Sequence, residues 1–199
     1  MTVQFGIHLP LLNFGDQPWT ITRLTTYLHE ATALGFNWAC ANDHLVFRQA
    51  WMDGPTALAA VLQACPEMTI ATTVALPVIR GPVQTAKLFG ALHTLSDGRF
   101  VGGIGPGSSP ADFAAAGIAF AERGTRFDES VRVLRVLLGK VKTPFRGTFY
   151  SSDTALEAPT PGCGTPPVWL GSWGSAAGIR RVAELGDGWL ASAYNTSPT

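Results

Sequence analysis

The sequence predicts an α/β protein of the (β/α)8 TIM-barrel type, with parallel strands and about six of the eight strand–helix units present. Six strand-like segments alternate with five of helical periodicity, a pattern typical of right-handed strand–helix repetition and a parallel sheet. Each predicted strand is followed by glycine, proline or polar residues, as in the loops that form the active-site face of a barrel. A complete doubly wound open sheet is the alternative, but its dinucleotide fingerprint fails because Ser108 stands where a third glycine should follow Gly103 and Gly105.

The length of the chain predicts one barrel domain over residues 1–199 that is incomplete at its C-terminal end. A full barrel of this kind usually needs about 250 residues, and the chain has 199. The strand–helix pattern breaks between residues 139 and 166, where proline, threonine and glycine are frequent. We expect this stretch to be a loop insertion with a small hairpin at residues 145–150.

The predicted strands are short, apolar or rich in β-branched residues, and bounded by residues that favour turns. They span residues 3–9, 38–41, 69–74, 100–104, 168–170 and 189–191. The third is expected to lead into a loop that runs from Pro77 to Pro82.

The predicted helices each carry apolar residues at helical spacing, which places these residues on one face. In chain order the faces are Ile21, Leu24, Leu28 and Ala31; Leu58, Val61 and Leu62; Leu88, Ala91, Leu92 and Leu95; Phe127, Val131, Leu134 and Leu138; and Ile179, Val182 and Ala183. Thr20 is suited to cap the first helix, and Asp53 precedes a second helix that has proline in its first turn. Ser109 and Pro110 favour a further helical turn after the fourth strand.

Composition indicates a compact protein and argues against several kinds of partner. Hydrophobic residues make up 46% of the chain and charged residues 14%, and the formal net charge is zero. Because there is no basic run or basic amphipathic face, we expect neither nucleic acid nor an anionic membrane as a partner. No apolar run approaches the ~18–20 residues of a membrane span. The three cysteines are widely spaced, so a cytoplasmic, reducing location is a simpler expectation than a disulfide framework or a zinc site.

Asp43 and His44 are the first candidates for chemistry because they follow the second predicted strand. A histidine at this end of a barrel strand, with a carboxylate nearby to hold its tautomer, can donate or accept a proton near neutral pH. A turn residue followed by a helix cap is the alternative interpretation. His8, at the end of the first strand, is a candidate to line the same pocket. No metal-ligand spacing and no G-x-S-x-G motif occurs, so neither a metal site nor a serine hydrolase is predicted.

Two glycine-rich loops are candidates for ligand contact. Residues 103–107 would let a flat ligand approach the backbone closely, although a tight strand-to-helix turn would also explain these glycines. Residues 171–175 precede a helix whose free backbone N–H groups, with the Ser175 hydroxyl beside them, would attract a phosphate.

Four segments, in the right order along nearly the whole chain, resemble the bacterial luciferase-like monooxygenase superfamily. They are residues 42–44 (NDH), residues 72–77 (TTVALP), residues 82–107 and residues 167–189. Members of that superfamily are (β/α)8 barrels that bind FMN or the deazaflavin coenzyme F-420, and they include monooxygenases, dehydrogenases and reductases.

The resemblance implies a role for each matching residue. Asp43 and His44 match a pair that contacts the cofactor and performs acid–base chemistry, with Asp43 orienting His44. Thr73 and Val74 match a bulge, often a non-proline cis peptide, that supports the flavin ring. The remaining matches lie beside the ring or at the loop and helix start that hold the ribityl-phosphate arm, and they are Pro106, Gly107, Gly174, Ser175 and Ala176.

The function implied by the resemblance is hydride transfer between a deazaflavin or FMN and a small organic substrate, and the Asp43-His44 dipeptide favours the deazaflavin. One alternative is an FMN monooxygenase that uses molecular oxygen, and another is a non-catalytic flavin-binding or incomplete barrel homologue. Ser108 stands where sugar-phosphate dehydrogenases of the deazaflavin branch have an acid, which argues against sugar-phosphate oxidation. The last predicted strand has no seventh strand to pair with, so its open edge predicts instability or self-association, a homodimer included.

Overall fold

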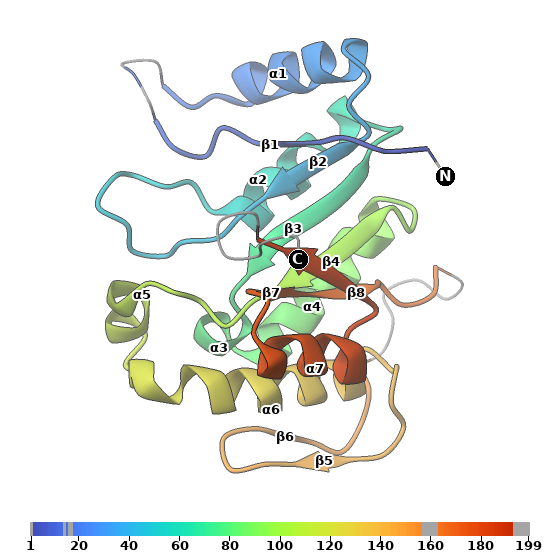
Figure 1. Ribbon diagram of the computed structural model, residues 1–199. Coiled ribbons are helices and arrows are strands. Elements are labelled where there is room, and N and C mark those ends of the chain that lie inside the picture. The colour runs from blue at the N-terminus through green and yellow to red at the C-terminus, as the bar shows by residue number, and fades with distance from the viewer. Residues whose placement is uncertain (1, 14, 16–17, 157–162, 193–199) are drawn as a thin grey trace.

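The computed structural model describes residues 2–13, 15, 18–156 and 163–192, and a curved sheet of six parallel strands lies at its centre (Figure 1). The strands are β1 (Gly6–His8), β2 (Trp38–Ala41), β3 (Thr69–Ala75), β4 (Phe100–Ile104), β7 (Val168–Ser172) and β8 (Gly188–Ala191). They follow one another in chain order across the sheet, and every pairing is parallel. The predicted six parallel strands are confirmed, and a doubly wound sheet is excluded because its strand order would reverse part-way. Within the described residues β1 and β8 are the two edges, so the sheet is a partial barrel.

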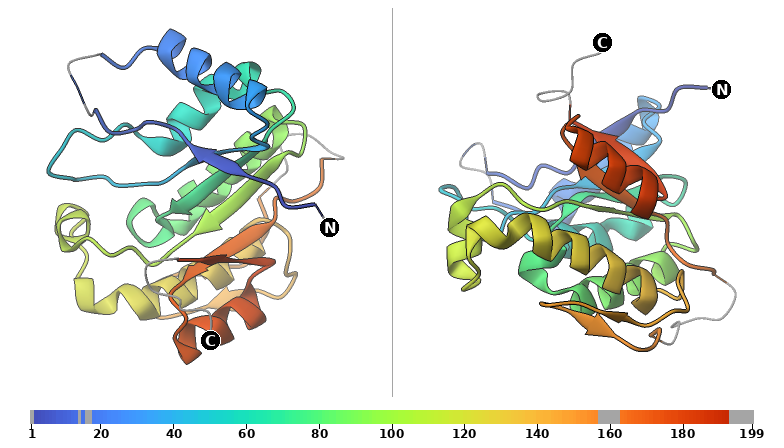
Figure 2. Two further views of the ribbon diagram at one scale, coloured as in Figure 1. Left: turned by 45° about the horizontal axis from the view of Figure 1, so that its top comes forward. Right: turned by 60° about the horizontal axis from the view of Figure 1, so that its bottom comes forward.

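The long helices lie on the outer side of this sheet (Figure 2). The helices are α1 (Ile21–Ala33), α2 (Gly54–Val61), α3 (Pro77–Arg80), α4 (Pro82–Leu95), α5 (Pro110–Ala115), α6 (Arg123–Leu137) and α7 (Ala176–Leu185), with 3-10 turns η1 (Leu62–Ala64) and η2 (Phe120–Glu122). The predicted cap at Thr20 and the predicted helix starts after Asp53 and Ser109 are confirmed, since side-chain oxygens of these three residues accept backbone N–H groups at 3.1, 3.0 and 3.3 Å. No helix in the described ranges combines the length and apolar character that a membrane crossing requires.

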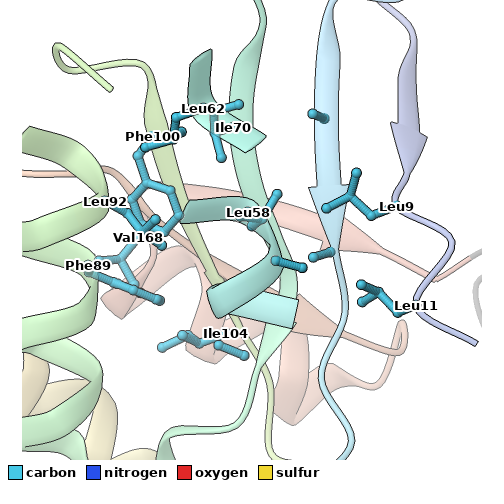
Figure 3. Packing of buried hydrophobic residues seen from close by; sticks show 14 of the residues in the cluster. Leu9, Leu11, Leu58, Leu62, Ile70, Phe89, Leu92, Phe100, Ile104 and Val168 are labelled. Carbon is cyan, nitrogen blue, oxygen red and sulfur yellow. The ribbon is translucent and has the colours of Figure 1, made fainter. Parts of the chain in front are cut away.

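The main core lies between the sheet and the helices. Ile70 and Phe100 point from the strands toward Leu58 of α2 and toward Phe89 and Leu92 of α4 (Figure 3). The rings of Phe89 and Phe100 pack edge to face, with their centroids 5.1 Å apart. This packing holds the strand ends in fixed positions, and the candidate site is built on those ends.

The inner side of the sheet carries a second, smaller apolar cluster. Because side chains alternate along a strand, Ala71 and Val101 face inward with Cys40, opposite to the helix-facing residues. Trp38 and Trp169 flank this cluster with ring centroids 5.4 Å apart. Burial here raises the pKa of the Cys40 thiol to about 11, so the thiol is protonated and unreactive at neutral pH.

The predicted apolar face of the third helix is wrong in part: Leu92 is buried and Leu88 packs against the core, but Ala91 is exposed. Leu95 is 63% exposed, whereas Phe89 and His93 of α4 are buried. The cause lies on the neighbouring strand: a Cβ on Gly102 would sit 2.2 Å from the Phe89 ring. The absence of a side chain at Gly102 of β4 therefore leaves room for the ring, and α4 is oriented so that Phe89 occupies this space. His93 is a core residue, with its ring nitrogens 3.3 and 3.0 Å from the carbonyl oxygens of Phe100 and Cys163.

Two further predictions need correction. Residues 77–80, expected in a loop, form the short helix α3, which begins with proline and closes with the N–H of Arg80 donating to the Leu76 carbonyl at 2.9 Å.

The hairpin in the 139–166 insertion exists, but its second strand begins later than expected. Its strands are β5 (Phe145–Arg146) and β6 (Ser151–Ser152), and residues 157–162 of the insertion lie outside the described residues.

Candidate functional site

A cavity of about 950 Å³ lies at the carboxyl ends of the strands. Its walls combine loops from both halves of the chain, as expected for the active-site face of a barrel. Seven of the sequence-predicted candidates line it: Asp43, His44, Thr73, Val74, Pro106, Gly107 and Ser175. His8 lines it as well, and burial lowers the pKa of its imidazole. Gly174 and Ala176, both within the described part of the chain, flank Ser175 without lining the cavity.

Thr73 and Val74 form a protrusion in the floor of the cavity. The peptide bond between them is cis, and the pairing of β3 with β4 shifts register between Thr72 and Ala75. A Cβ on Gly105 would lie only 2.6 Å from a Val74 methyl group, so the glycine on the neighbouring loop leaves room for this protrusion. The bulge and the cis peptide that the resemblance implied are therefore both present.

His44 is held by a carboxylate from a distant part of the chain. Its Nδ1 lies 3.0 Å from Oδ2 of Asp112, which is on α5 and buried. The other oxygen of Asp112 accepts the backbone N–H groups of Leu45 and Val46 at 3.1 and 2.6 Å. Asp112, and not Asp43 as expected from the sequence, is therefore the carboxylate that orients His44.

Asp43 takes part in a separate ion-pair network. It is buried, and Arg80 of α3 binds both of its oxygens, with Nε at 2.5 Å and Nη2 at 2.7 Å. These hydrogen bonds raise the pKa of the Arg80 guanidinium above its ordinary value. Arg80 also bonds the cap residue Asp53, so one guanidinium joins the end of β2, the start of α2 and the loop after β3.

The start of α7 lies on the opposite wall from the sheet's first strands. The Ser175 hydroxyl accepts the N–H of Gly178 at 3.1 Å and caps the helix. Ser172 and Ser175 line the cavity there, and Arg123, whose guanidinium stacks on the Phe120 ring at 4.1 Å, is another lining residue. Backbone N–H groups of a first helical turn, hydroxyls and a cation suit an anionic group such as a phosphate.

Sequence reasoning missed Asp112 and the Arg80 network. Asp112 is 68 residues from His44, and only the folding of α5 against the loop after β2 brings them together. The one local signal was Ser109, which predicts a helical turn that carries an acidic residue in its first turn. That signal explains Asp112 as a helix residue and says nothing about His44.

The family model of the luciferase-like monooxygenases matches residues 3–198. The chain belongs to this family. An F420-dependent glucose-6-phosphate dehydrogenase from Amycolatopsis mediterranei is 29% identical over 175 residues, which are 84% of this chain and 52% of the relative. The chain thus spans about half of this relative, and it spans 38%, 44% and 49% of the length of three other curated relatives.

Solved structures show the same family fold. An F420-dependent secondary alcohol dehydrogenase, in complex with an F420–acetone adduct, superimposes with a TM-score of 0.79 at 22% identity and covers 96% of this chain and 58% of its own. The oxygenating constituent of 3,6-diketocamphane monooxygenase from Pseudomonas putida, in complex with FMN, gives a TM-score of 0.74 at 18% identity and covers 92% and 56%. At 22% and 18% identity, these two structures show that this luciferase-like chain shares their fold, and no more than the fold.

Proposed function

We propose that this chain carries the cofactor-binding and proton-transferring part of a flavin-type oxidoreductase that uses coenzyme F-420 or FMN. The observation that carries the proposal is that the Thr73–Val74 protrusion, the His44 imidazole and the start of α7 all line one cavity. These three features come from different strand ends, and each matches a part of the site that the family resemblance implies. Membership of the luciferase-like family supports the same class of reaction.

The residues present fit such a cofactor. The volume of about 950 Å³ falls in the range of roughly 300–1,000 Å³ that small-molecule and cofactor sites occupy. Thr73, Val74, Pro106 and Gly107 would hold the ring, and Gly174, Ser175 and Ala176 would hold the phosphate-bearing arm at the start of α7. Asp43 would contact the cofactor from its fixed position on Arg80.

The division of labour in the reaction follows from this arrangement. A bound flavin or deazaflavin supplies the hydride acceptor or donor. His44 lines the cavity, and its Nε2 would take a proton from the reacting group of a small organic substrate or return it. Arg80 and Asp43 would keep the loop after β2 in place during this transfer.

The deazaflavin is our first choice of cofactor, because the Asp43-His44 dipeptide favours it and because relatives in the comparisons are named as F420-dependent enzymes. An FMN enzyme that consumes oxygen is the second candidate, supported by likeness in fold to an FMN-bound monooxygenase. Titration of the purified chain with each cofactor, followed by fluorescence, distinguishes the two. Binding of FMN with oxygen consumption and no binding of the deazaflavin would overturn the first choice.

The variant His44→Gln tests the role of the imidazole. We expect cofactor binding to persist while hydride transfer falls on the order of 100-fold or more, the usual contribution of a positioned acid or base. Asp153→Asn is the matched control, because it removes an exposed carboxylate of the hairpin that pairs only with Arg146 among the bonds described for it. Unchanged turnover in His44→Gln would remove His44 from the mechanism. A folded chain that binds neither cofactor would instead be a non-catalytic homologue.

A further inference from the structure

The contact between Asp112 and His44 has the geometry of a carboxylate that sets the state of an imidazole. Asp112 is 1% exposed, and three nitrogen atoms lie within hydrogen-bond distance of its two oxygens. His44 Nδ1 lies next to Oδ2, and the backbone N–H groups of Leu45 and Val46 donate to Oδ1. An ionised carboxylate can only accept hydrogen bonds, and a neutral imidazole carries one hydrogen. With the hydrogen on Nδ1, Nε2 keeps its lone pair.

Two aromatic rings fix the plane of the imidazole. The centroid of the His44 ring lies 4.9 Å from that of Phe47 and 4.8 Å from that of Trp51. Phe47 and Trp51 also contact each other edge to face, with centroids 5.0 Å apart. The ring is therefore held at Nδ1 by Asp112 and on its sides by aromatic neighbours, while His44 remains part of the cavity wall.

The geometry points to Asp112 as the positioning residue of this site: it holds His44 in the tautomer with hydrogen on Nδ1, so that Nε2 is the atom that exchanges a proton with a substrate in the cavity. The catalytic meaning of this inference rests on the proposed function, whereas the tautomer itself is a property of the chain without any cofactor. A second effect follows from the same contacts. Because Asp112 also bonds the two residues after His44, α5 fixes the loop that carries the imidazole.

The tautomer is measurable directly in the unliganded chain by long-range proton–nitrogen correlation spectra of its histidines, of which there are four. The spectrum of His44→Gln assigns the His44 signals by their loss. In the wild-type chain with a neutral His44 ring, we expect hydrogen on Nδ1 and a pyridine-like Nε2. A ring with hydrogen on Nε2 overturns the inference.

Asp112→Asn tests the cause. The asparagine keeps the size of the side chain and an oxygen for the backbone N–H groups, but its amide can donate to Nδ1, which would move the ring hydrogen to Nε2. We expect the tautomer pattern to reverse in this variant and to stay unchanged in the control Asp153→Asn. A wild-type pattern in folded Asp112→Asn means that the carboxylate does not set the tautomer, and it contradicts the inference.

Turnover separates this inference from the proposed function. If both hold, Asp112→Asn lowers kcat by on the order of 100-fold or more, as loss of the correct tautomer does in acid–base dyads, with a much smaller change in KM. If the wild-type ring carries its hydrogen on Nδ1 but the folded chain transfers no hydride with either cofactor, the tautomer assignment stands and the proposed function fails. If hydride transfer depends on His44 while Asp112→Asn turns over normally, the proposed function stands and the role of Asp112 fails.

Discussion

Arg80 is the residue near the site whose loss should cost the most stability. It is the guanidinium that pairs with Asp43, whose side chain is 1% exposed, and removing it leaves a buried carboxylate without its cation. Breaking a buried pair from one side typically costs about 3–5 kcal/mol. We expect Arg80→Ala to lower the free energy of unfolding by about 3 kcal/mol in urea titrations.

An exposed ion pair provides the control for that measurement. Arg146 and Asp153 face each other at 2.9 Å on the hairpin, with side chains 73% and 60% exposed. Pairs of this kind contribute roughly 0–1 kcal/mol because water and salt screen them. Similar losses in Arg80→Ala and Arg146→Ala would show that the Asp43 network is no more important than a surface pair.

At the scale of single residues, the sequence predicts local relationships and misses distant ones. The cap at Thr20 and the helix starts after Asp53 and Ser109 are predictable because a cap acts on a backbone N–H within three residues. Asp43 and His44 were found because they follow a strand. Their partners Arg80 and Asp112 are 37 and 68 residues away, so nothing near Asp43 or His44 identifies them.

At the scale of elements, the packing of α4 on β4 depends on one glycine. A Cβ on Gly102 would lie 2.2 Å from the Phe89 ring, far inside contact distance, and the ring is fully buried against Phe100. We expect Gly102→Ala to destabilise the chain by about 1–3 kcal/mol through overpacking. Adding Phe89→Leu should recover part of that loss, measured by thermal unfolding of the double variant.

A second glycine gives the opposite expectation. Gly124 lies in α6, and a Cβ there would meet nothing within 4 Å. Replacing a helical glycine by alanine reduces the conformational entropy lost on folding, so Gly124→Ala should stabilise by about 0.5–1 kcal/mol. If Gly102→Ala were equally stabilising, the explanation for the orientation of α4 would be wrong.

Phe89 and Gly102 show why the apolar pattern of a helix is insufficient to predict which of its faces is buried. Leu88, Leu92 and Leu95 have the spacing of a buried stripe, yet Leu95 is exposed and the buried side of α4 carries Phe89 beside Leu92. The space left at Gly102 belongs to another element, and periodicity within one helix contains no information about it. By contrast, Phe127, Val131 and Leu134 of α6 are buried as predicted.

Asp187 links three elements and gives a pH dependence. Its carboxylate accepts the N–H of Val168 at the start of β7 and pairs with Arg135 of α6 and with Lys140 in the segment after α6. Burial alone raises the pKa of Asp187, but the Val168 N–H and the two cations outweigh it and lower the pKa below its ordinary value of 3.8. The unfolded chain therefore takes up this proton first as the pH falls.

The sign of the effect on stability follows from that order. Above about pH 5 both states are ionised and the full contribution of Asp187 is present, and it is lost as the pH falls through the lowered folded pKa. We expect the difference in unfolding free energy between the wild type and Asp187→Asn to be constant above about pH 5 and to shrink below about pH 4. A difference that grows with acidity would contradict the role assigned to this carboxylate.

At the scale of the whole molecule, alternation of strand and helix predicted the sheet because each unit is completed locally before it joins its neighbours. The chain order of the strands and their parallel pairing follow from the same repetition. What repetition leaves open is closure: the described strands end at β1 and β8, and the chain spans about half the length of its curated relatives.

Within the described ranges, the edges of the sheet at β1 and β8 lead to a prediction about association. Trp189 on β8 is 40% exposed, and Phe5, next to β1, is 62% exposed. An edge strand presents unpaired backbone groups, and exposed apolar side chains along it favour pairing with another chain.

We expect the chain to self-associate with increasing concentration in sedimentation velocity. Trp189→Lys should shift the distribution toward the monomer, because a charged side chain on an edge opposes strand pairing. Leu95→Lys is the matched control, since Leu95 is an exposed apolar residue at the end of α4, a helix that packs against the interior strand β4. Circular dichroism of each variant verifies that the fold persists after the change. A wild type that stays monomeric throughout, or equal dissociation by both variants, would mean that the β8 edge does not drive assembly.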